Sequence, residues 1–153
     1  DEPTTSLDVT VQAQLLEIIA GLRSELDMAV IVITHNLGLV ARYVDRVNVM
    51  YAGKLVEAGP TDTIFASPQH PYTIGLLASV PRLDSKRKIT PKVIDGLPPN
   101  LAHLPPGCSF APRCSYAMDK CHTEKPEIES VGKDHLRTCF YDPSKLKPAA
   151  VKA

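Results

Sequence analysis

The sequence contains no tryptophan and few other aromatic residues. Phe and Tyr make up 5% of its 153 residues, whereas hydrophobic residues as a whole make up 44%. The core should therefore be mostly aliphatic. Charged residues account for 22%, which is typical of a soluble globular chain. No apolar run reaches the ~20 residues that a helix needs to cross a bilayer. We expect one domain, or one core with an appendage.

Proline and cysteine are almost missing from the first part of the chain. Only Pro3 lies before residue 60, and all four cysteines fall between residues 108 and 139. Charge divides similarly, with an excess of acidic residues over 1–83 and of basic residues over 84–153. We expect an ordered α/β segment over 1–83, a loop-rich extension over 84–142 and a disordered tail over 143–153. The basic residues are too scattered to indicate a nucleic-acid partner.

The first 35 residues have the pattern of a helix followed by a buried strand. Asp8 is a good N-cap for a helix over about 9–26, in which apolar residues recur at helical spacing. Residues 28–34, MAVIVIT, form a continuous apolar run rich in β-branched side chains. Such a run is typical of a strand buried on both faces of a parallel sheet. A strand, this helix and this second strand would make a βαβ unit with a right-handed crossover.

A hairpin and several shorter elements are predicted further along. RVNVMY (46–51) and KLVEAG (54–59) flank an Ala-Gly pair, which predicts a β-hairpin with Gly53 in the turn. Periodicity is lost after Pro81, and the proline-rich stretch 96–107 predicts an irregular connector. Short helices are predicted over 36–44 and from Thr61 and Pro71 onward.

Two adjacent carboxylates stand at Asp1 and Glu2. Pro3 cannot continue a central strand, so the pair should lie where a strand ends, at the edge where parallel α/β sheets bind ligands. His35 follows the apolar run 28–34 and should emerge at the same edge. One carboxylate there can hold Mg²⁺, and a second can deprotonate an attacking water. The alternative is that Asp1 and Glu2 form a solvated turn and that His35 is an ordinary surface histidine. Taken alone, each of these features favours that alternative.

Three motifs in this order resemble the second half of the nucleotide-binding subunits of ABC transporters. They are DEPTTSLD (1–8), VIVITHNLGLV (30–40) and VDRVNVMYAGKLVEAGP (44–60). The resemblance implies part of a P-loop NTPase core with parallel strands. Two later features resemble one branch of that family, the ATPase subunits of oligopeptide, dipeptide and nickel importers. These are IFASPQHPYTIGLLASVPRLD (64–84) and the four-cysteine segment.

The resemblance also implies roles for individual residues. Asp1 and Glu2 match the end of the Walker B strand, so Asp1 would help bind the Mg²⁺ of Mg–ATP through water and Glu2 would be the general base. His35 matches the switch histidine and would contact the γ-phosphate. Ser6, where alanine is commoner in the family, and Asp8 belong to the D-loop and would face a second ATPase subunit.

The sequence lacks three other motifs of such a subunit. No G-x-x-x-x-G-K-[ST] loop is present to cradle the phosphates of ATP. An LSGGQ-type signature and a Gln loop are missing as well. We therefore expect the chain to be the C-terminal part of a longer subunit, whether as a cloned fragment, a proteolytic product or a truncated frame. Alone it should neither bind ATP tightly nor hydrolyse it, and its uncovered sheet edges should favour self-association.

The four cysteines are spaced C-x5-C-x6-C-x17-C, and three bonding states compete for them. Disulfides are disfavoured in a cytoplasmic protein, and structural zinc usually shows C-x2–4-C pairs. A [4Fe–4S] cluster places its thiolates around a larger cubane and tolerates varied spacings. Neither the cysteine spacing nor the basic charge of this segment excludes zinc. The resemblance to the peptide-importer branch favours a [4Fe–4S] cluster on Cys108, Cys114, Cys121 and Cys139. His70 and His103 are expected to be structural, and His122 and His135 to be solvated loop residues.

Together these features predict part of an ATP-binding subunit of an importer for oligopeptides or dipeptides, on the cytoplasmic face of the cell membrane. A second ATPase subunit and transmembrane permease subunits are the expected partners, with a solute-binding protein acting indirectly. The alternative is a stand-alone iron–sulfur or zinc module without ATPase activity, in which Asp1, Glu2 and His35 would be remnants.

Overall fold

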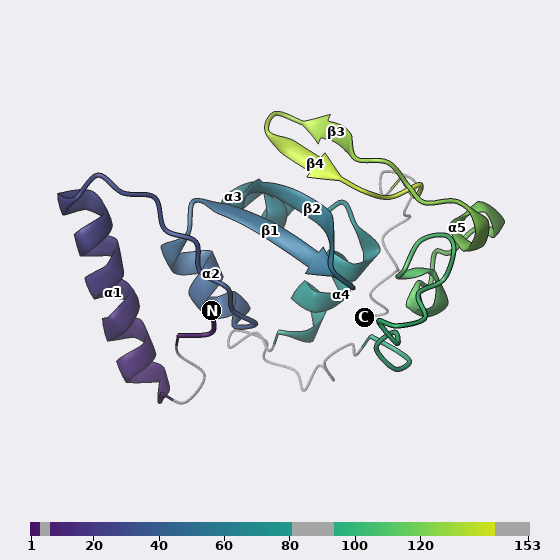
Figure 1. Cartoon of the computed structure of the whole chain (residues 1–153). Helices are drawn as coiled ribbons and strands as arrows, with labels where there is room; N and C mark the ends of the chain where they lie inside the picture. The colour runs from purple at the N-terminus through teal and green to yellow at the C-terminus, as the bar shows by residue number, and fades with distance from the viewer. Residues whose placement is uncertain (4–6, 81–93, 143–153) are drawn as a thin grey trace, which may run out of the picture. The chain divides into compact units, whose positions relative to one another are not determined.

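The computed structural model describes residues 1–3, 7–80 and 94–142, in which helices and an antiparallel sheet are combined (Figure 1). The chain divides into two compact units, Asp1–Asp45 and Arg46–Ala153. The predicted tail over 143–153 lies outside the described residues. None of the helices in the described ranges has the length and apolarity required to cross a membrane.

The first unit contains the two helices predicted for it. Helix α1 (Val9–Glu25) begins at Asp8, whose carboxylate accepts hydrogen bonds from the backbone N–H groups of Thr10 and Val11, each at 3.0 Å. Helix α2 (Leu37–Tyr43) is capped in the same way by the side chain of Asn36. Both caps satisfy backbone donors that a helix leaves unpaired in its first turn, and both predicted helices are confirmed.

The predicted buried strand over 28–34 is wrong for this structure. The segment is not part of a sheet, and Ile31 and Ile33 are 90% and 57% exposed. One backbone bond resembles a strand contact, the 2.8 Å bond from the Glu2 N–H to the Ile33 carbonyl. A parallel strand needs neighbouring strands for its backbone groups and helices over both faces. The parallel P-loop core is accordingly not observed among the described residues, where every strand pair is antiparallel.

The second unit is built on a four-stranded sheet in the order β1-β2-β4-β3. Strands β1 (Arg46–Tyr51) and β2 (Lys54–Pro60) form the predicted hairpin. Its turn residues Ala52 and Gly53 have φ angles of 48° and 72°, the two positive values that a tight type I′ hairpin turn requires. The hairpin is confirmed.

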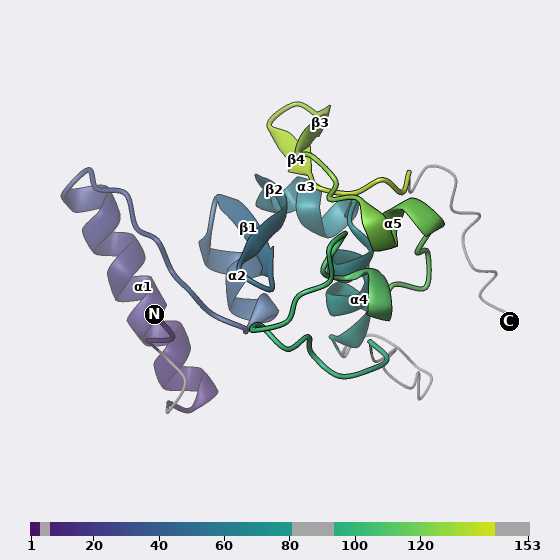
Figure 2. The same ribbon diagram turned by 45° about the vertical axis from the view of Figure 1, so that its right-hand side comes forward.

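A second hairpin completes the sheet, and the sequence did not predict it. Strands β3 (Glu129–Gly132) and β4 (His135–Arg137) pair with each other, and β4 pairs with β2 (Figure 2). The strands are only four and three residues long, too short to show an alternating pattern. Through this pairing, strands from the predicted α/β segment and from the predicted extension share one sheet.

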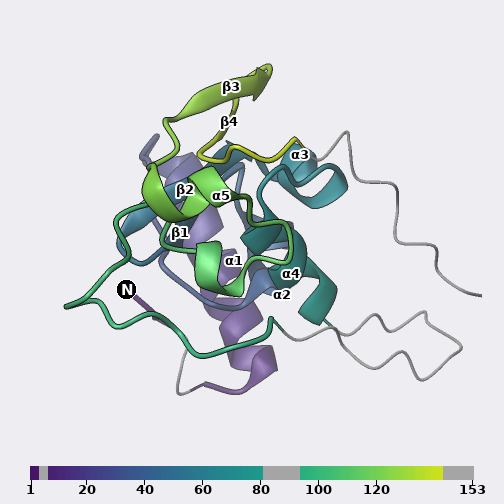
Figure 3. The ribbon, with the colours of Figure 1, turned by 90° about the vertical axis from the view of Figure 1, so that its right-hand side faces the viewer.

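The short helices α3 (Thr61–Ala66), α4 (Pro71–Ser79) and α5 (Asp119–Thr123) lie beside strands β1 and β2, and the β3–β4 hairpin projects away from them (Figure 3). Helices α3 and α4 begin at the predicted residues, with Pro71 in the first turn, where its missing N–H is no loss. The irregular connector predicted over 96–107 is also observed. The 3₁₀ turn η1 (Ala111–Arg113) and helix α5 follow it and were not predicted.

The core of the second unit is more aromatic than the composition suggested. Val49, Tyr51, Val56 and Phe110 form its buried cluster, against which Tyr72 packs. The rings of Tyr51 and Tyr72 meet edge to face at 4.7 Å, and those of Tyr51 and Phe110 at 5.1 Å. Three of the eight aromatic residues of the chain thus meet in this core, where each contributes a large buried area.

Candidate functional site

The first candidate site is the contact between Glu2 and His35. Glu2 Oε1 lies 3.0 Å from Nδ1 of His35, and the two side chains are 47% and 73% exposed. The bond between Glu2 N–H and the Ile33 carbonyl places the two segments side by side. The structure thus brings together a carboxylate and an imidazole that lie 33 residues apart in the sequence. A carboxylate so placed can accept a proton, and the imidazole can orient it or share the proton.

Local hydrogen bonds fix the backbone directly after His35. The Asn36 N–H donates to Thr34 Oγ1 at 3.1 Å, and Asn36 Oδ1 accepts from the N–H groups of Gly38 and Leu39. His35 is therefore held at the entrance to helix α2.

The other residues predicted around this site are placed as follows. Asp1 is exposed. Asp8 is also exposed, and its carboxylate caps helix α1. Ser6 lies outside the described residues. The binding roles of all three remain predictions.

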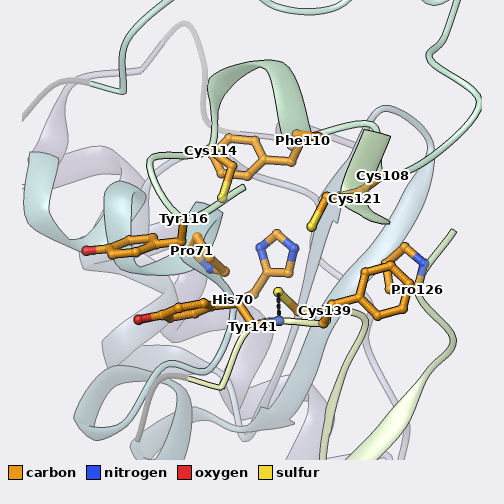
Figure 4. A pocket seen from close by; sticks show the side chains of 12 residues that line it. His70, Pro71, Cys108, Phe110, Cys114, Tyr116, Cys121, Pro126, Cys139 and Tyr141 are labelled. Atoms are coloured by element: carbon orange, nitrogen blue, oxygen red, sulfur yellow. Dashed lines mark hydrogen bonds between the residues drawn. The ribbon is translucent and has the colours of Figure 1, made fainter. Parts of the chain in front are cut away.

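The second candidate site is a pocket lined by all four cysteines, called here the four-cysteine pocket (Figure 4). Each thiol comes from a different local structure: one follows the connector, one ends η1, one lies in α5 and one follows β4. The sequence predicted that the four would act together, and the structure gathers them around one cavity. The remaining lining residues are His70, Pro71, Phe110, Ala111, Tyr116, Pro126, Phe140 and Tyr141.

Backbone contacts hold the cysteine loops against one another. The Cys108 N–H donates to the Cys121 carbonyl at 2.8 Å. Gly107, beside it, is packed so closely that a Cβ would lie 2.3 Å from the same carbonyl oxygen. A glycine is therefore required at 107. Two backbone N–H groups donate to sulfur, from Met118 to Cys121 at 3.4 Å and from Tyr141 to Cys139 at 3.3 Å.

Burial makes three of these thiols weaker acids. It raises the pKa of Cys108 and of Cys114 above the ordinary value, and it raises that of Cys139 to about 11; neighbouring thiols add to each increase. Cys108, Cys114 and Cys139 are therefore harder to deprotonate than an ordinary thiol, whereas a metal ligand must be a thiolate. Within the described ranges, no three His, Cys, Asp or Glu side chains form a group that could hold a metal ion. What the structure does show is that the four cysteines line the same pocket.

The second unit also contains a buried carboxylate, that of Glu57. Glu57 on β2 is 1% exposed, and its oxygens accept hydrogen bonds from the backbone N–H groups of Gln69 at 2.6 Å and His70 at 2.9 Å. Its Oε1 also lies 2.8 Å from Nε2 of His135, which is equally buried. Glu57 therefore joins β2, the start of α4 and β4.

The four predicted histidines differ in their surroundings. His103 is exposed, so the structural role predicted for it is not observed. His122 is solvated as predicted, but it lies in helix α5 and not in a loop. The same prediction is wrong for His135, because the short strand β4 turns this side chain inward onto Glu57. His70 is 1% exposed and points into the four-cysteine pocket, which the sequence did not indicate. One sequence signal could have indicated that the His70 side chain is fixed: it directly precedes Pro71, at the position where helix α4 needs an N-cap.

Comparison with known proteins relates the chain to peptide importers. Residues 56–121 match the family model described as "Oligopeptide/dipeptide transporter, C-terminal region". A putative peptide import ATP-binding protein of Brucella melitensis is 50% identical over 145 residues, covering 92% of this chain and 43% of that protein. The oligopeptide transport ATP-binding protein OppD of Haemophilus influenzae is 47% identical over 146 residues, covering 95% and 45%. OppD of Mycobacterium bovis is 49% identical over 140 residues, which cover 92% of this chain and 23% of that protein. The chain thus spans less than half the length of these relatives.

Proposed function

We propose that the chain is the C-terminal part of the ATP-binding subunit of a peptide importer; residues 56–121 match the model of oligopeptide/dipeptide transporter C-terminal regions. One observation carries the proposal. About half of the residues over 92% of the chain are identical to those of proteins named for peptide import and ATP binding. The full subunit would couple ATP hydrolysis to the uptake of oligopeptides or dipeptides. ATP-dependent peptide uptake by the full-length subunit with its permease is the test.

The contact between Glu2 and His35 supports a catalytic role for this pair. As general base, Glu2 would take a proton from the water that attacks the γ-phosphate. His35 would hold Glu2 in place through its Nδ1 contact at 3.0 Å, and would contact the γ-phosphate with its other ring nitrogen. Asp1 would help hold Mg²⁺ through water. ATP and Mg²⁺ would be bound by the full subunit, whose phosphate-binding loop this chain does not contain.

The exposed apolar segment supports a place in a larger sheet. Residues 28–34 would become a buried parallel strand once neighbouring strands and helices of the full subunit cover it. Ile31 and Ile33 are 90% and 57% exposed, as expected for an apolar surface that packs against another part of the protein. In this arrangement residues 1–83 would belong to the nucleotide-binding domain, and residues 84–142 would form its extension.

The proposed partners follow from the same reading. Ser6 and Asp8 would lie at the contact with a second ATPase subunit, and the pair of subunits would drive a transmembrane permease. The subunit would be peripheral, on the cytoplasmic face of the membrane, and a solute-binding protein would deliver the peptide.

We further propose that the four-cysteine pocket binds a [4Fe–4S] cluster with a structural or regulatory role. Its support is the gathering of four thiols from separate segments around one cavity. Cys108, Cys114, Cys121 and Cys139 would be the ligands, and the cluster would supply four strong bonds that tie their loops together. Zinc on the same thiolates is the alternative.

Metal analysis separates these two alternatives. The full-length subunit purified without oxygen is expected to contain about four iron and four sulfide per subunit, the composition of one such cluster, with broad visible absorption. A Cys121→Ser variant should lose most of this iron, because Cys121 is the most buried of the four. An exposed-site variant, Ser115→Ala, is the matched control and should keep it. Stoichiometric zinc without iron would contradict the cluster.

A further inference from the structure

His70 is the one imidazole that lines the four-cysteine pocket. Figure 4 shows its ring pointing into the pocket, with the sulfur atoms of Cys121 and Cys139 on either side of it in this view. The side chain is 1% exposed, and its ring packs against Phe110 with the centroids 5.8 Å apart. This ring is therefore not a solvated loop histidine but a fixed part of the pocket.

Three hydrogen bonds fix the position of this residue. The His70 N–H donates to Glu57 Oε2 at 2.9 Å, and the neighbouring Gln69 N–H donates to Glu57 Oε1. The ring nitrogen Nδ1 accepts from the Tyr72 N–H at 3.1 Å, which caps helix α4. The backbone and one side of the ring are thus held by groups outside the pocket.

These contacts also determine which ring nitrogen carries the proton. A nitrogen that accepts a backbone N–H has its lone pair in that bond, so in a neutral imidazole the proton must be on Nε2. Nε2 is then a hydrogen-bond donor. The ring lines the four-cysteine pocket, where the sulfur atoms of Cys121 and Cys139 are the acceptors nearest to it in Figure 4.

We propose that His70 is the hydrogen-bond donor of the four-cysteine pocket, with its Nε2–H directed at a sulfur atom held there. This inference rests on the proposed binding of a cluster to the same pocket, and it adds a residue outside the ligand set. A donor aimed at sulfur stabilises the negative charge on that sulfur. In an iron–sulfur site it therefore favours the reduced form and raises the reduction potential. His70 is a positioning and tuning residue, not a ligand.

Two substitutions separate this role from the structural role of His70. In His70→Asn, the side-chain oxygen can still accept the Tyr72 N–H, since asparagine is among the best N-caps, but the shorter side chain withdraws the donor from the pocket. In His70→Phe, a ring still fills the space beside Phe110, but both the donor and the cap are lost. The control is His103→Asn, which removes an exposed imidazole from the connector.

The first measurement is NMR of the full-length subunit labelled with ¹⁵N at histidine, using His70→Asn to assign the signal. The expected result is a proton on Nε2 that exchanges slowly with water, and none on Nδ1. A proton on Nδ1, or fast exchange of the Nε2 proton, would overturn the proposal.

The second measurement is the midpoint reduction potential of the subunit loaded anaerobically with ferrous iron and sulfide. Both His70 variants should shift it to more negative values, while His103→Asn leaves it unchanged. Equal potentials in all four proteins would overturn the proposal, because a merely structural residue would change the melting temperature alone. If the wild-type subunit takes up no iron, the cluster assignment fails, and the NMR result alone decides whether His70 is the donor.

Discussion

Replacing Glu2 by glutamine in the full-length subunit is expected to reduce ATP turnover by about 10²- to 10⁴-fold, the range that general-base catalysis contributes. Glutamine keeps the shape of the side chain and can still meet His35, which lies 3.0 Å from Glu2 Oε1. It cannot take a proton from water. Binding of Mg–ATP should therefore persist. Steady-state phosphate release and equilibrium binding of a fluorescent ATP analogue measure the two effects separately.

The control for this experiment is Glu25→Gln, which changes an exposed carboxylate at the end of α1 and should leave turnover unchanged. A His35→Ala variant should also lose most of its activity, because the imidazole that positions Glu2 is gone. Turnover near the wild-type rate in Glu2→Gln would remove this residue from the role of base and leave its contact with His35 as a surface ion pair.

The second large effect is expected at Glu57. Removing its carboxylate with Glu57→Ala should lower the free energy of unfolding by about 3–5 kcal/mol, because each buried donor that loses its acceptor costs about 1–3 kcal/mol. The variant leaves the backbone donors of Gln69 and His70 without their acceptor, and it leaves His135 buried without its partner. Urea unfolding followed by tyrosine fluorescence reports on this unit, because Tyr51 and Tyr72 lie in and against its core.

Glu127→Ala provides the matched comparison, since Glu127 is an exposed carboxylate in the same unit. Its effect should stay within about 0.5 kcal/mol. The double variant Glu57→Ala with His135→Ala should cost less than the sum of the two single changes, because the two groups share one interaction. A loss of less than about 1 kcal/mol in Glu57→Ala would show that the buried pair does not hold the sheet to helix α4.

Local sequence signals were sufficient where an element depends on its own residues. Asp8 and Asn36 cap the two helices of the first unit, Pro71 opens α4, and Gly53 supplies a positive φ in the β1–β2 turn. Each of these residues acts on backbone groups within a few positions of itself. The corresponding elements were therefore predictable without any knowledge of the tertiary structure.

Elements that depend on distant partners were not predictable in the same way. The run 28–34 has the composition of a buried strand, but a strand forms only when neighbours take up its backbone groups. Strand β4 shows the converse: three residues with no strand pattern pair with β2, and this pairing brings His135 onto Glu57. Such outcomes depend on contacts between residues 78 positions apart.

The candidate sites show the same difference between features that the sequence indicates and features that depend on distant contacts. The pairing of Glu2 with His35 followed from the expectation that both lie at one strand edge, and the two side chains do meet. The gathering of the four cysteines followed from their isolation in a short segment. The presence of His70 among them did not, because its place in the pocket is fixed by Glu57, which lies on another strand.

The most direct test of the account is peptide uptake by proteoliposomes that contain the full-length subunit, its partner ATPase and the permease, with the solute-binding protein and labelled oligopeptide outside and ATP within. We predict accumulation of peptide that requires ATP and is abolished by Glu2→Gln. Accumulation that is the same with Glu2→Gln or without ATP would contradict the account, as would ATP hydrolysis that never leads to uptake of any peptide.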